Sequence, residues 1–371
     1  MGPQANPPQP PGFPVTPMLD SGRASPIIVA EEQRCGAVML ITVPAKDLRE
    51  REGPAIAPAE QREPLRAPHH VVDGFLPADL AREMRAAIDA HFGEPYRQAA
   101  DPYQVWNYWY VPNLYTYLRT TPNKVIPRAL VERFHSALTA WSWNVLGMGR
   151  VTPPFLSLYI PGCSQAFHND SGNGRFGFVY SLTHNVRETR GGETLVMHEG
   201  DLFRANLERP QAGHGGFYEA IAPSFNRLTI FDDRMPHAVQ RVDGSMDPRE
   251  GRFVLHGHIS ETGPGTRGAL TPAEVGTVVE EAANEVLEAR TMTADPHGPV
   301  VVRLAIAASG EVQTARLMLD RAAFPDGSSA NGLADAIVAA AAQRRFPERD
   351  SPTEAIVPIL LGGALAVGGK A

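Results

Sequence analysis

Three side chains in the middle of the chain could together hold one metal ion. His168 and Asp170 stand two residues apart, and His237 follows much later, behind the apolar run 227–231. Side chains two residues apart leave the same face of a strand, so the first two can reach one centre. Two imidazoles and one carboxylate, with other positions open, form the facial arrangement of non-heme Fe(II) oxygenases. This spacing alone is weak evidence for a metal site, because an isolated His-x-Asp pair is more often a surface turn.

Three further motifs surround these residues in a fixed order. The strand-like run FLSLYIPG precedes the first histidine, RGGETLV lies between Asp170 and His237, and GRFVLHGHIS follows. In this order the sequence resembles the Fe(II)/2-oxoglutarate-dependent dioxygenases, most closely their prolyl-4-hydroxylase-like branch. The resemblance covers roughly residues 66–262 and names no substrate.

The resemblance implies a role for each of these residues. His168, Asp170 and His237 would bind Fe(II), 2-oxoglutarate would chelate the iron, and O2 would take the remaining position; ascorbate is an optional further cofactor. Asp170 favours hydroxylation, since the related halogenases carry a small residue there. Tyr159 is expected to meet 2-oxoglutarate, with an ordinary core tyrosine as the equal alternative.

The distal carboxylate of 2-oxoglutarate requires a buried cation. A guanidinium suits it because its planar fork meets a carboxylate with two parallel hydrogen bonds. Arg252, which begins an apolar strand after His237, is our choice. Arg249 and Arg241 are rivals, because the long turn DGSMDPREG exceeds the separation usual in the family. Prolyl-4-hydroxylases themselves usually carry lysine here, so arginine indicates the wider superfamily.

Other polar residues lie near these motifs. Period-two alternation puts His256 and His258 on the face of Arg252, and we expect neither to be a metal ligand; His256 is interpreted as a buried neutral histidine. In the GGET turn, we expect Gly192 to be required by the backbone conformation and Thr194 to pack in the sheet, with no catalytic role for either. Position alone makes four residues candidates for substrate contact: Asn169, Asn173, Arg175 and His184.

Composition limits the class of protein. The chain has 371 residues, enough for two domains and a sizeable core. Its 34 basic and 41 acidic residues give a net charge of -7, which does not favour nucleic-acid binding. Two cysteines are too few for a disulfide framework, and no apolar run approaches the length of a membrane span. We therefore expect a cytoplasmic protein without nucleic-acid or membrane partners.

Short apolar runs separated by turns predict a mostly β fold with flanking helices. Amphipathic helices are expected near Pro77 and over 128–146. The aromatic run 103–118 is interpreted as a half-buried strand, and the alternative is that Trp106, Asn107 or Tyr108 shapes a substrate pocket. A double-stranded β-helix, or jelly roll, is predicted from eight strand-like runs at about 154–160, 165–168, 175–183, 192–197, 217–222, 227–232, 237–242 and 252–260.

Three parts are expected along the chain. Residues 1–65 form a proline-rich arm and linker, with a hairpin or two added strands at 26–43; residues 66–265 form the jelly-roll domain; residues 266–371 form a connecting helix and a small α+β domain. The last part resembles the C-terminal domain of TonB-type energy transducers in its Phe-Pro after the helix and its late strand with a proline. We expect an interaction or homodimerisation module there, and a substrate-recognition module is the alternative.

The predicted function is hydroxylation of an unactivated C–H, on a peptide or protein side chain as in the resembling branch. A free amino acid or a natural-product intermediate is the alternative substrate. Two other classes stay open, namely a non-catalytic jelly-roll module that binds a metal or ligand and a zinc hydrolase that uses the same three ligands. The sequence shows no obvious general base for the hydrolase beside His168 and Asp170.

Overall fold

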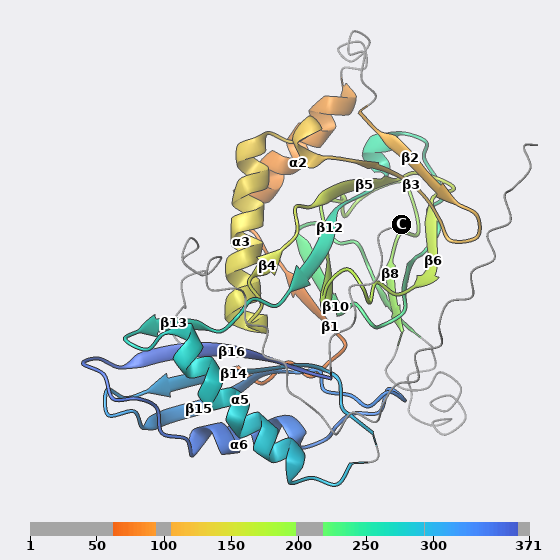
Figure 1. Cartoon of the computed structure of the whole chain (residues 1–371). Coiled ribbons are helices and arrows are strands. Elements are labelled where there is room, and N and C mark those ends of the chain that lie inside the picture. The colour runs from red at the N-terminus through yellow and green to blue at the C-terminus, as the bar shows by residue number, and fades with distance from the viewer. Residues whose placement is uncertain (1–61, 94–104, 198–217, 293, 363–371) are drawn as a thin grey trace, which may run out of the picture. The chain divides into compact units, whose positions relative to one another are not determined.

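Short antiparallel strands form one large curled sheet in the computed structural model (Figure 1). Among the described residues it has 12 strands, in the order β1-β10-β7-β12-β5-β3-β6-β11-β8-β9, with β2 paired to β3 and β4 to β12. The predicted jelly-roll core is confirmed, with all eight predicted strands near their expected positions. The strands are β1 (His69–Asp73), β2 (Asn107–Val111), β3 (Tyr115–Thr120), β4 (Arg150–Val151), β5 (Phe155–Tyr159), β6 (Ser164–His168), β7 (Phe176–Ser181), β8 (Thr194–Met197), β9 (Tyr218–Ile221), β10 (Arg227–Asp232), β11 (His237–Val239) and β12 (Arg252–Ser260).

The structure describes residues 62–93, 105–197, 218–292 and 294–362. These residues all belong to one compact unit that spans 35–371. The proline-rich arm, the hairpin expected at 26–43 and most of the expected linker lie outside the described residues. In the described part of the linker, Leu65 forms a bridge with Leu319. No helix of the described part is long and apolar enough to cross a membrane.

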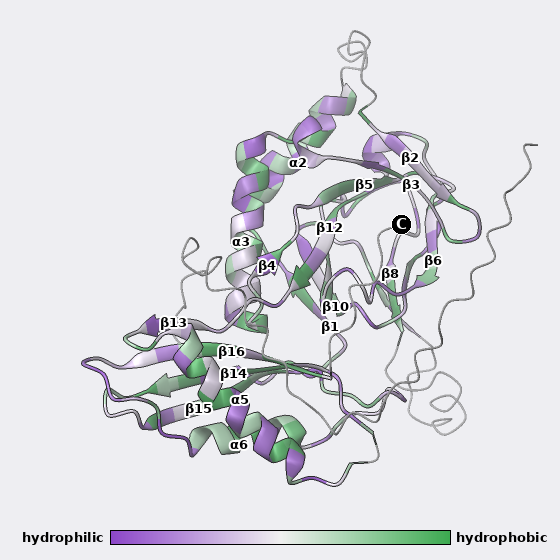
Figure 2. Cartoon of the chain, viewed as in Figure 1, coloured by the Kyte–Doolittle hydropathy of each residue, from purple (hydrophilic) through white to green (hydrophobic). Residues whose placement is uncertain are grey.

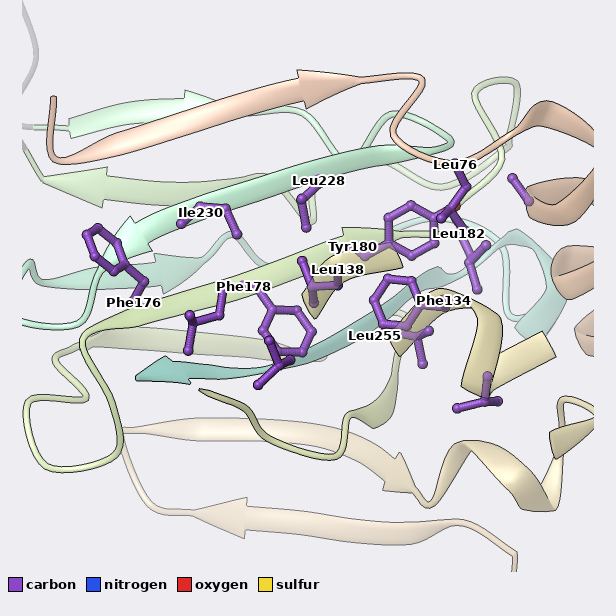
Figure 3. Close-up of a cluster of buried hydrophobic side chains, with 14 of the residues drawn as sticks. Leu76, Phe134, Leu138, Phe176, Phe178, Tyr180, Leu182, Leu228, Ile230 and Leu255 are labelled. Carbon is purple, nitrogen blue, oxygen red and sulfur yellow. The ribbon is translucent and has the colours of Figure 1, made fainter. Parts of the chain in front are cut away.

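Two helices, α2 (Ala78–Gly93) and α3 (Arg128–Leu146), pack against one face of the sheet. The helix predicted over 128–146 is confirmed, and it ends at Gly147, whose left-handed φ of 69° terminates the helix. Alternation along β7 and β12 supplies the apolar face that meets α3. Figure 3 shows the resulting cluster, which includes Phe134, Leu138, Phe176, Phe178, Tyr180 and Leu255.

The aromatic run does not form the single half-buried strand that its composition indicated. It folds into a hairpin of β2 and β3, joined by a turn with Asn113 at a φ of 60°. Strand β2 pairs with β3 alone, so Asn107 to Tyr110 are exposed. Trp106, a candidate pocket residue, instead packs against Phe92 and Phe253 beneath the sheet.

The predicted small α+β domain is confirmed. Its four-stranded sheet has the order β13-β16-β14-β15, and helices α5 and α6 share one hydrophobic core with it. Figure 2 shows β14 and β16 mostly in the colour of hydrophobic residues. Val301, Leu319 and Ile356 belong instead to the core cluster that contains α2 and α3. The elements are β13 (Gly265–Gly268), α5 (Pro272–Glu288), β14 (Gly298–Ile306), β15 (Val312–Asp320), α6 (Leu333–Ala342) and β16 (Thr353–Leu361), and two short 3-10 helices, η2 (Pro122–Lys124) and η3 (Pro248–Glu250), lie earlier.

Replacing Phe134 by alanine should test the packing of α3 on the sheet. The Phe134 ring is fully buried and lies 4.9 Å from the Tyr180 ring, between centroids. We expect the free energy of unfolding, measured by urea denaturation, to fall by about 3–5 kcal/mol because a large cavity is left. Ser136→Ala, at an exposed position of the same helix, should change it by less than about 0.5 kcal/mol. Equal effects of the two substitutions would contradict this packing.

Candidate metal centre

The structure brings His168, Asp170 and His237 together. Strand β11 pairs with β6 so that His237 lies directly opposite His168, and Asp170 follows β6 by two residues. One ligand atom from each side chain lies within 4.8 Å of the other two. The strands that carry them lie on the side of the curled sheet away from α3 (Figure 1). A pairing between segments distant in sequence therefore assembles the three side chains.

The backbone selects the tautomer of both histidines. Nδ1 of His168 donates a hydrogen bond to the carbonyl of Ala166 at 2.8 Å, and Nδ1 of His237 donates to the carbonyl of Met235 at 3.1 Å. A carbonyl oxygen can only accept, so the proton of each neutral ring must be on Nδ1. Nε2 of each ring is left as a free electron-pair donor, and it is the atom that a metal ion would bind.

Asp170 is an anion at neutral pH. Burial by itself raises the pKa of this carboxyl, but the imidazoles of His237, His258 and His168 outweigh it and lower the pKa to about 2. Burial lowers the pKa of His168, which favours the neutral ring that a metal requires. Oδ2 of Asp170 lies 3.4 Å from Nε2 of His237. Two electron-pair donors this close repel each other unless a proton or a metal ion lies between them.

This donor set fits a divalent iron ion. Two neutral imidazoles and one carboxylate are the ligands of the facial triad, and the three groups leave further coordination positions open. Zinc accepts the same ligand types, so the donor set alone does not distinguish the two metals. The residues around these three groups must therefore distinguish an iron site from a zinc site.

A second polar pair lies beside Asp170. Nδ1 of His258 is 3.0 Å from Oδ2 of Asp233, whose side chain is fully buried. Burial lowers the pKa of His258, but the hydrogen bond to Asp233 outweighs it and raises the pKa. Asp170, Asp233 and His258 form a second group whose ligand atoms lie within 4.8 Å of one another. The sequence analysis missed Asp233, because nothing in the run FDDR distinguishes it from its neighbours.

Arg252 is buried in the interior of the curled sheet. Only 1% of its surface is exposed, and its guanidinium lies 4.7 Å from the centre of the Tyr159 ring. Nη2 donates a hydrogen bond to Oγ1 of Thr194 at 3.0 Å, so Thr194 does more than the sheet packing we had assigned to it. Gly192, at a φ of 83°, lies against the same side chain. Residues from three separate sequence motifs therefore meet at one place.

The charge of Arg252 has no carboxylate partner among the described residues, and its Nε has no hydrogen-bond partner there. Burial lowers the pKa of Arg252, but a guanidinium stays protonated under nearly all conditions. Burying an unpaired charge is costly, and natural proteins usually offset the cost with an anion. The surroundings of Arg252 therefore fit an anionic ligand such as the distal carboxylate of 2-oxoglutarate.

The two rival arginines are in a different situation. The side chain of Arg249 is 50% exposed and pairs with Asp247 at 2.6 Å. The side chain of Arg241 is 64% exposed and pairs with Asp243 at 3.3 Å. Exposed paired cations are poorly suited to grip a buried carboxylate, so Arg252 stays the preferred anchor.

Tyr159 belongs to a stack of aromatic rings next to Arg252. Its ring lies 5.2 Å from that of Tyr117 and nearly parallel to it, at 14°. Its hydroxyl donates a hydrogen bond to Oε1 of Gln165 at 3.0 Å. Burial raises the pKa of Tyr159, so the hydroxyl stays protonated and able to donate. Tyr117 and Gln165 were not singled out in the sequence analysis, since only the pairing of β3, β5 and β6 brings them here.

His256 lies on β12 between Arg252 and His258. Burial, followed by the charges of Arg119, His258 and Arg252, lowers the pKa of His256 to about 3. Nε2 of its neutral ring is 2.8 Å from the hydroxyl of Ser157. The expectation of a neutral histidine on this face agrees with these contacts.

The candidate substrate contacts lie in different places. Nδ2 of Asn173 donates to Asp170 Oδ1 at 3.3 Å, and the side-chain amide oxygen of Asn169 accepts a hydrogen bond from Ser171. Arg175 pairs with Glu261 through two hydrogen bonds, and His184 lies near Asp89. Among the described residues, Asn173 is the one of these four whose side chain donates a hydrogen bond to a triad residue.

Comparison with known proteins gives only weak likenesses. No protein-family model matches the chain, and no curated protein matches it. Similar solved structures include a prolyl-4-hydroxylase of Pseudomonas putida (16% identity, TM-score 0.36, 53% of this chain and 94% of that chain covered). Another is a prolyl hydroxylase of Trichoplax adhaerens in complex with a hypoxia inducible factor oxygen degradation domain peptide fragment (15% identity, TM-score 0.34, 51% of this chain and 82% of that chain covered). A third is the non-heme alpha ketoglutarate-dependent epimerase SnoN from nogalamycin biosynthesis (12% identity, TM-score 0.36, 52% of this chain and 79% of that chain covered). Similarity at this level supports no assignment, so the site's own geometry must carry one.

Gly192→Ala should test the placement of Arg252. An added Cβ would lie 2.9 Å from Cδ of Arg252, so the guanidinium must shift. We expect the affinity for N-oxalylglycine, measured by calorimetry with Mn(II) present, to fall roughly tenfold. Gly74→Ala is the matched control, because Gly74 also has a positive φ but an added Cβ meets no atom within 4 Å. Both substitutions should cost about 1–2 kcal/mol of stability through backbone strain. If they weakened binding equally, Gly192 would not act through Arg252.

Proposed function

We propose that this protein is an Fe(II)- and 2-oxoglutarate-dependent oxygenase that hydroxylates an unactivated C–H bond. One observation carries the proposal: a buried guanidinium without a carboxylate partner among the described residues lies in the same sheet interior as two imidazoles and a carboxylate with converging ligand atoms. A metal centre that also binds a dicarboxylate cosubstrate needs both features. A simple metal-binding module needs only the second.

Under this proposal, different residues would bind the metal and the cosubstrate. His168, Asp170 and His237 would hold the metal, and the hydrogen bonds of the two Nδ1 atoms would keep the imidazoles oriented. Arg252 and Thr194 would bind the distal carboxylate of 2-oxoglutarate, with Tyr159 alongside. When bound, Fe(II) together with 2-oxoglutarate and O2 would supply the oxidising power for C–H hydroxylation, with 2-oxoglutarate converted to succinate and carbon dioxide. Buried Val239, Val242 and Val254 would exclude water from this region.

The substrate we propose is a peptide or protein side chain. The exposed hairpin of β2 and β3 supports this choice, because an edge strand can pair with an extended peptide. A free amino acid or a natural-product intermediate is the alternative substrate. Under the same proposal, residues 1–65 serve as an arm and linker, 66–265 as the oxygenase domain, and 266–371 as a TonB-like module for partner binding or homodimerisation.

A metal-dependent hydrolase is the second candidate. The pair of Asp233 and His258 favours it, since a carboxylate and an imidazole beside Asp170 could accept a proton from a metal-bound water. A hydrolase has no need for O2 or for the buried Arg252. Activity under strictly anaerobic conditions, with zinc and without 2-oxoglutarate, would favour the hydrolase over the oxygenase.

Succinate formation tests the metal triad. With Fe(II), 2-oxoglutarate and O2, we expect the intact chain to release succinate, and His168→Ala or Asp170→Ala to reduce the rate roughly a hundredfold or more. Asp73→Ala is the control, because it removes an exposed carboxylate that pairs with Arg227, at the end of β1 away from the Phe231 ring that contacts His237. Metal content, measured on the same samples, should fall in the two triad variants alone. Unchanged succinate release from either triad variant would exclude the proposed ligand set.

The 2-oxoglutarate requirement tests the anchor. Arg252→Ala should raise the KM for 2-oxoglutarate about ten- to a hundredfold, because a hydrogen-bonded charge pair is lost. Arg252→Lys keeps the charge and should recover part of the affinity, as a lysine cannot form the planar fork. Arg249→Ala is the matched control and should leave KM unchanged. If Arg249→Ala produced the large effect instead, our assignment of the anchor would be wrong.

A further inference from the structure

Arg119 lies between two aromatic rings on the inner face of the β2–β3 hairpin. Its guanidinium carbon is 3.7 Å from the centre of the Trp109 ring and 4.1 Å from the centre of the Phe155 ring. These distances are close enough for a cation–π interaction with each ring. The three side chains come from β2, β3 and β5, so the sheet itself sets the arrangement.

The two rings lie against the guanidinium, and the side chain of Tyr117 forms a hydrogen bond with it. All five N–H donors of an arginine lie in the plane of the group and point outward from its edge. Among the described residues, no carboxylate forms an ion pair with Arg119, and the same is true of Arg252. A guanidinium held by its faces is pre-oriented to grip a planar anion through two parallel hydrogen bonds.

Strand register places Arg119 on the same face as the proposed metal centre. Arg119 lies opposite Ser157, whose hydroxyl contacts His256, and Phe155 contacts the His256 ring at 6.0 Å. Burial raises the pKa of Tyr117, and the charges of Arg119 and Asp170 both act on that residue. Arg119 and the triad therefore face a common set of interior side chains.

Arg119 also lies where a ligand can reach it. Trp109 is 37% exposed and Phe155 is 42% exposed, so the rings that hold the guanidinium form part of the rim of the curled sheet. Arg252, by contrast, is 1% exposed. Arg252 and Arg119 thus lie at different depths of the interior.

We infer that Arg119 is a specificity-determining residue that binds a carboxylate of the substrate at the rim of the sheet. The inference rests on the proposed function for the identity of the substrate site, and it adds that the substrate is acidic. A carboxylate fits better than a single-point anion, because the five N–H donors of a guanidinium lie in one plane and can bind two oxygens at once. The carboxylate can belong to an acidic peptide side chain or to a small organic acid.

Matched acid and amide probes test the inference. We would titrate the full chain, saturated with Mn(II) and N-oxalylglycine so that the Arg252 site is filled, with acetyl-Ala-Glu-Ala-amide and its glutamine counterpart. A second pair, hippurate and hippuramide, represents small organic acids. We expect the acid to bind about tenfold more tightly than the amide in at least one pair, and the pair that shows it identifies the source. No acid preference in either pair would overturn the inference.

Variants locate the preference. Arg119→Gln should abolish the acid preference, and Arg119→Lys should retain only part of it because the fork is lost. Arg128→Gln, which removes an exposed arginine of α3, should leave the preference intact. An acid preference that survives in Arg119→Gln would overturn the inference. Raising the salt concentration should weaken the preference of the unaltered chain, which tests the charge without relying on any variant's folding.

The proposed function and the inference about Arg119 can fail independently in these experiments. Binding of Mn(II) and N-oxalylglycine is measured first, and its absence counts against the oxygenase alone. The acid and amide pairs can still be compared on the metal-free chain, because Arg119, Trp109 and Phe155 include none of the proposed metal ligands. An acid preference without metal binding would support an acid-binding site at the rim while removing the oxygenase.

Discussion

The alternation of side chains along β12 is the constraint on which the rest of the structure depends. Phe253 and Leu255 pack into the core beneath the sheet, and Arg252, Val254 and His256 face its interior. A shift of one residue in the register of β12 would send the arginine into the apolar core and a phenylalanine into the polar interior. Packing against the helices therefore fixes the placement of the candidate anion anchor, and stability and chemistry share one strand.

The charged side chains of the sheet interior lie at different depths. Arg252 lies at depth, the carboxylate of Asp170 lies among the imidazoles, and Arg119 lies at the rim. The pKa of His256 is lowered first by burial and then by nearby positive charges, so the ring stays neutral between the two arginines. Each neutral imidazole of the triad is oriented by a backbone carbonyl, so no charged partner competes with a bound metal. The arrangement suits a site that must take up both a cation and anions.

Much of the fold was predictable from the sequence, since periodicity is a local property. The strands of the curled sheet, helix α3 and the small α+β domain all follow from short-range patterns of apolar residues. The residues of the candidate site were predictable where a motif marks them, as with His168 and Asp170. Asp233, Gln165 and Tyr117 were not, because their proximity to the site depends on pairing between distant strands. The aromatic run misled for a related reason: composition indicated burial, but β2 is an edge strand.

The difference between the two interior arginines shows why burial and pairing must be considered together. An exposed arginine with a carboxylate partner, such as Arg249, has its charge balanced within the chain and gives no indication of a ligand. Arg252 is buried with no such partner among the described residues, so folding incurs a desolvation cost that an anion would offset. Arg119 is only half-buried, and the faces of two rings partly replace the lost hydration. The aromatic contacts thus allow a cation without a carboxylate partner among the described residues to be held in one place at the rim.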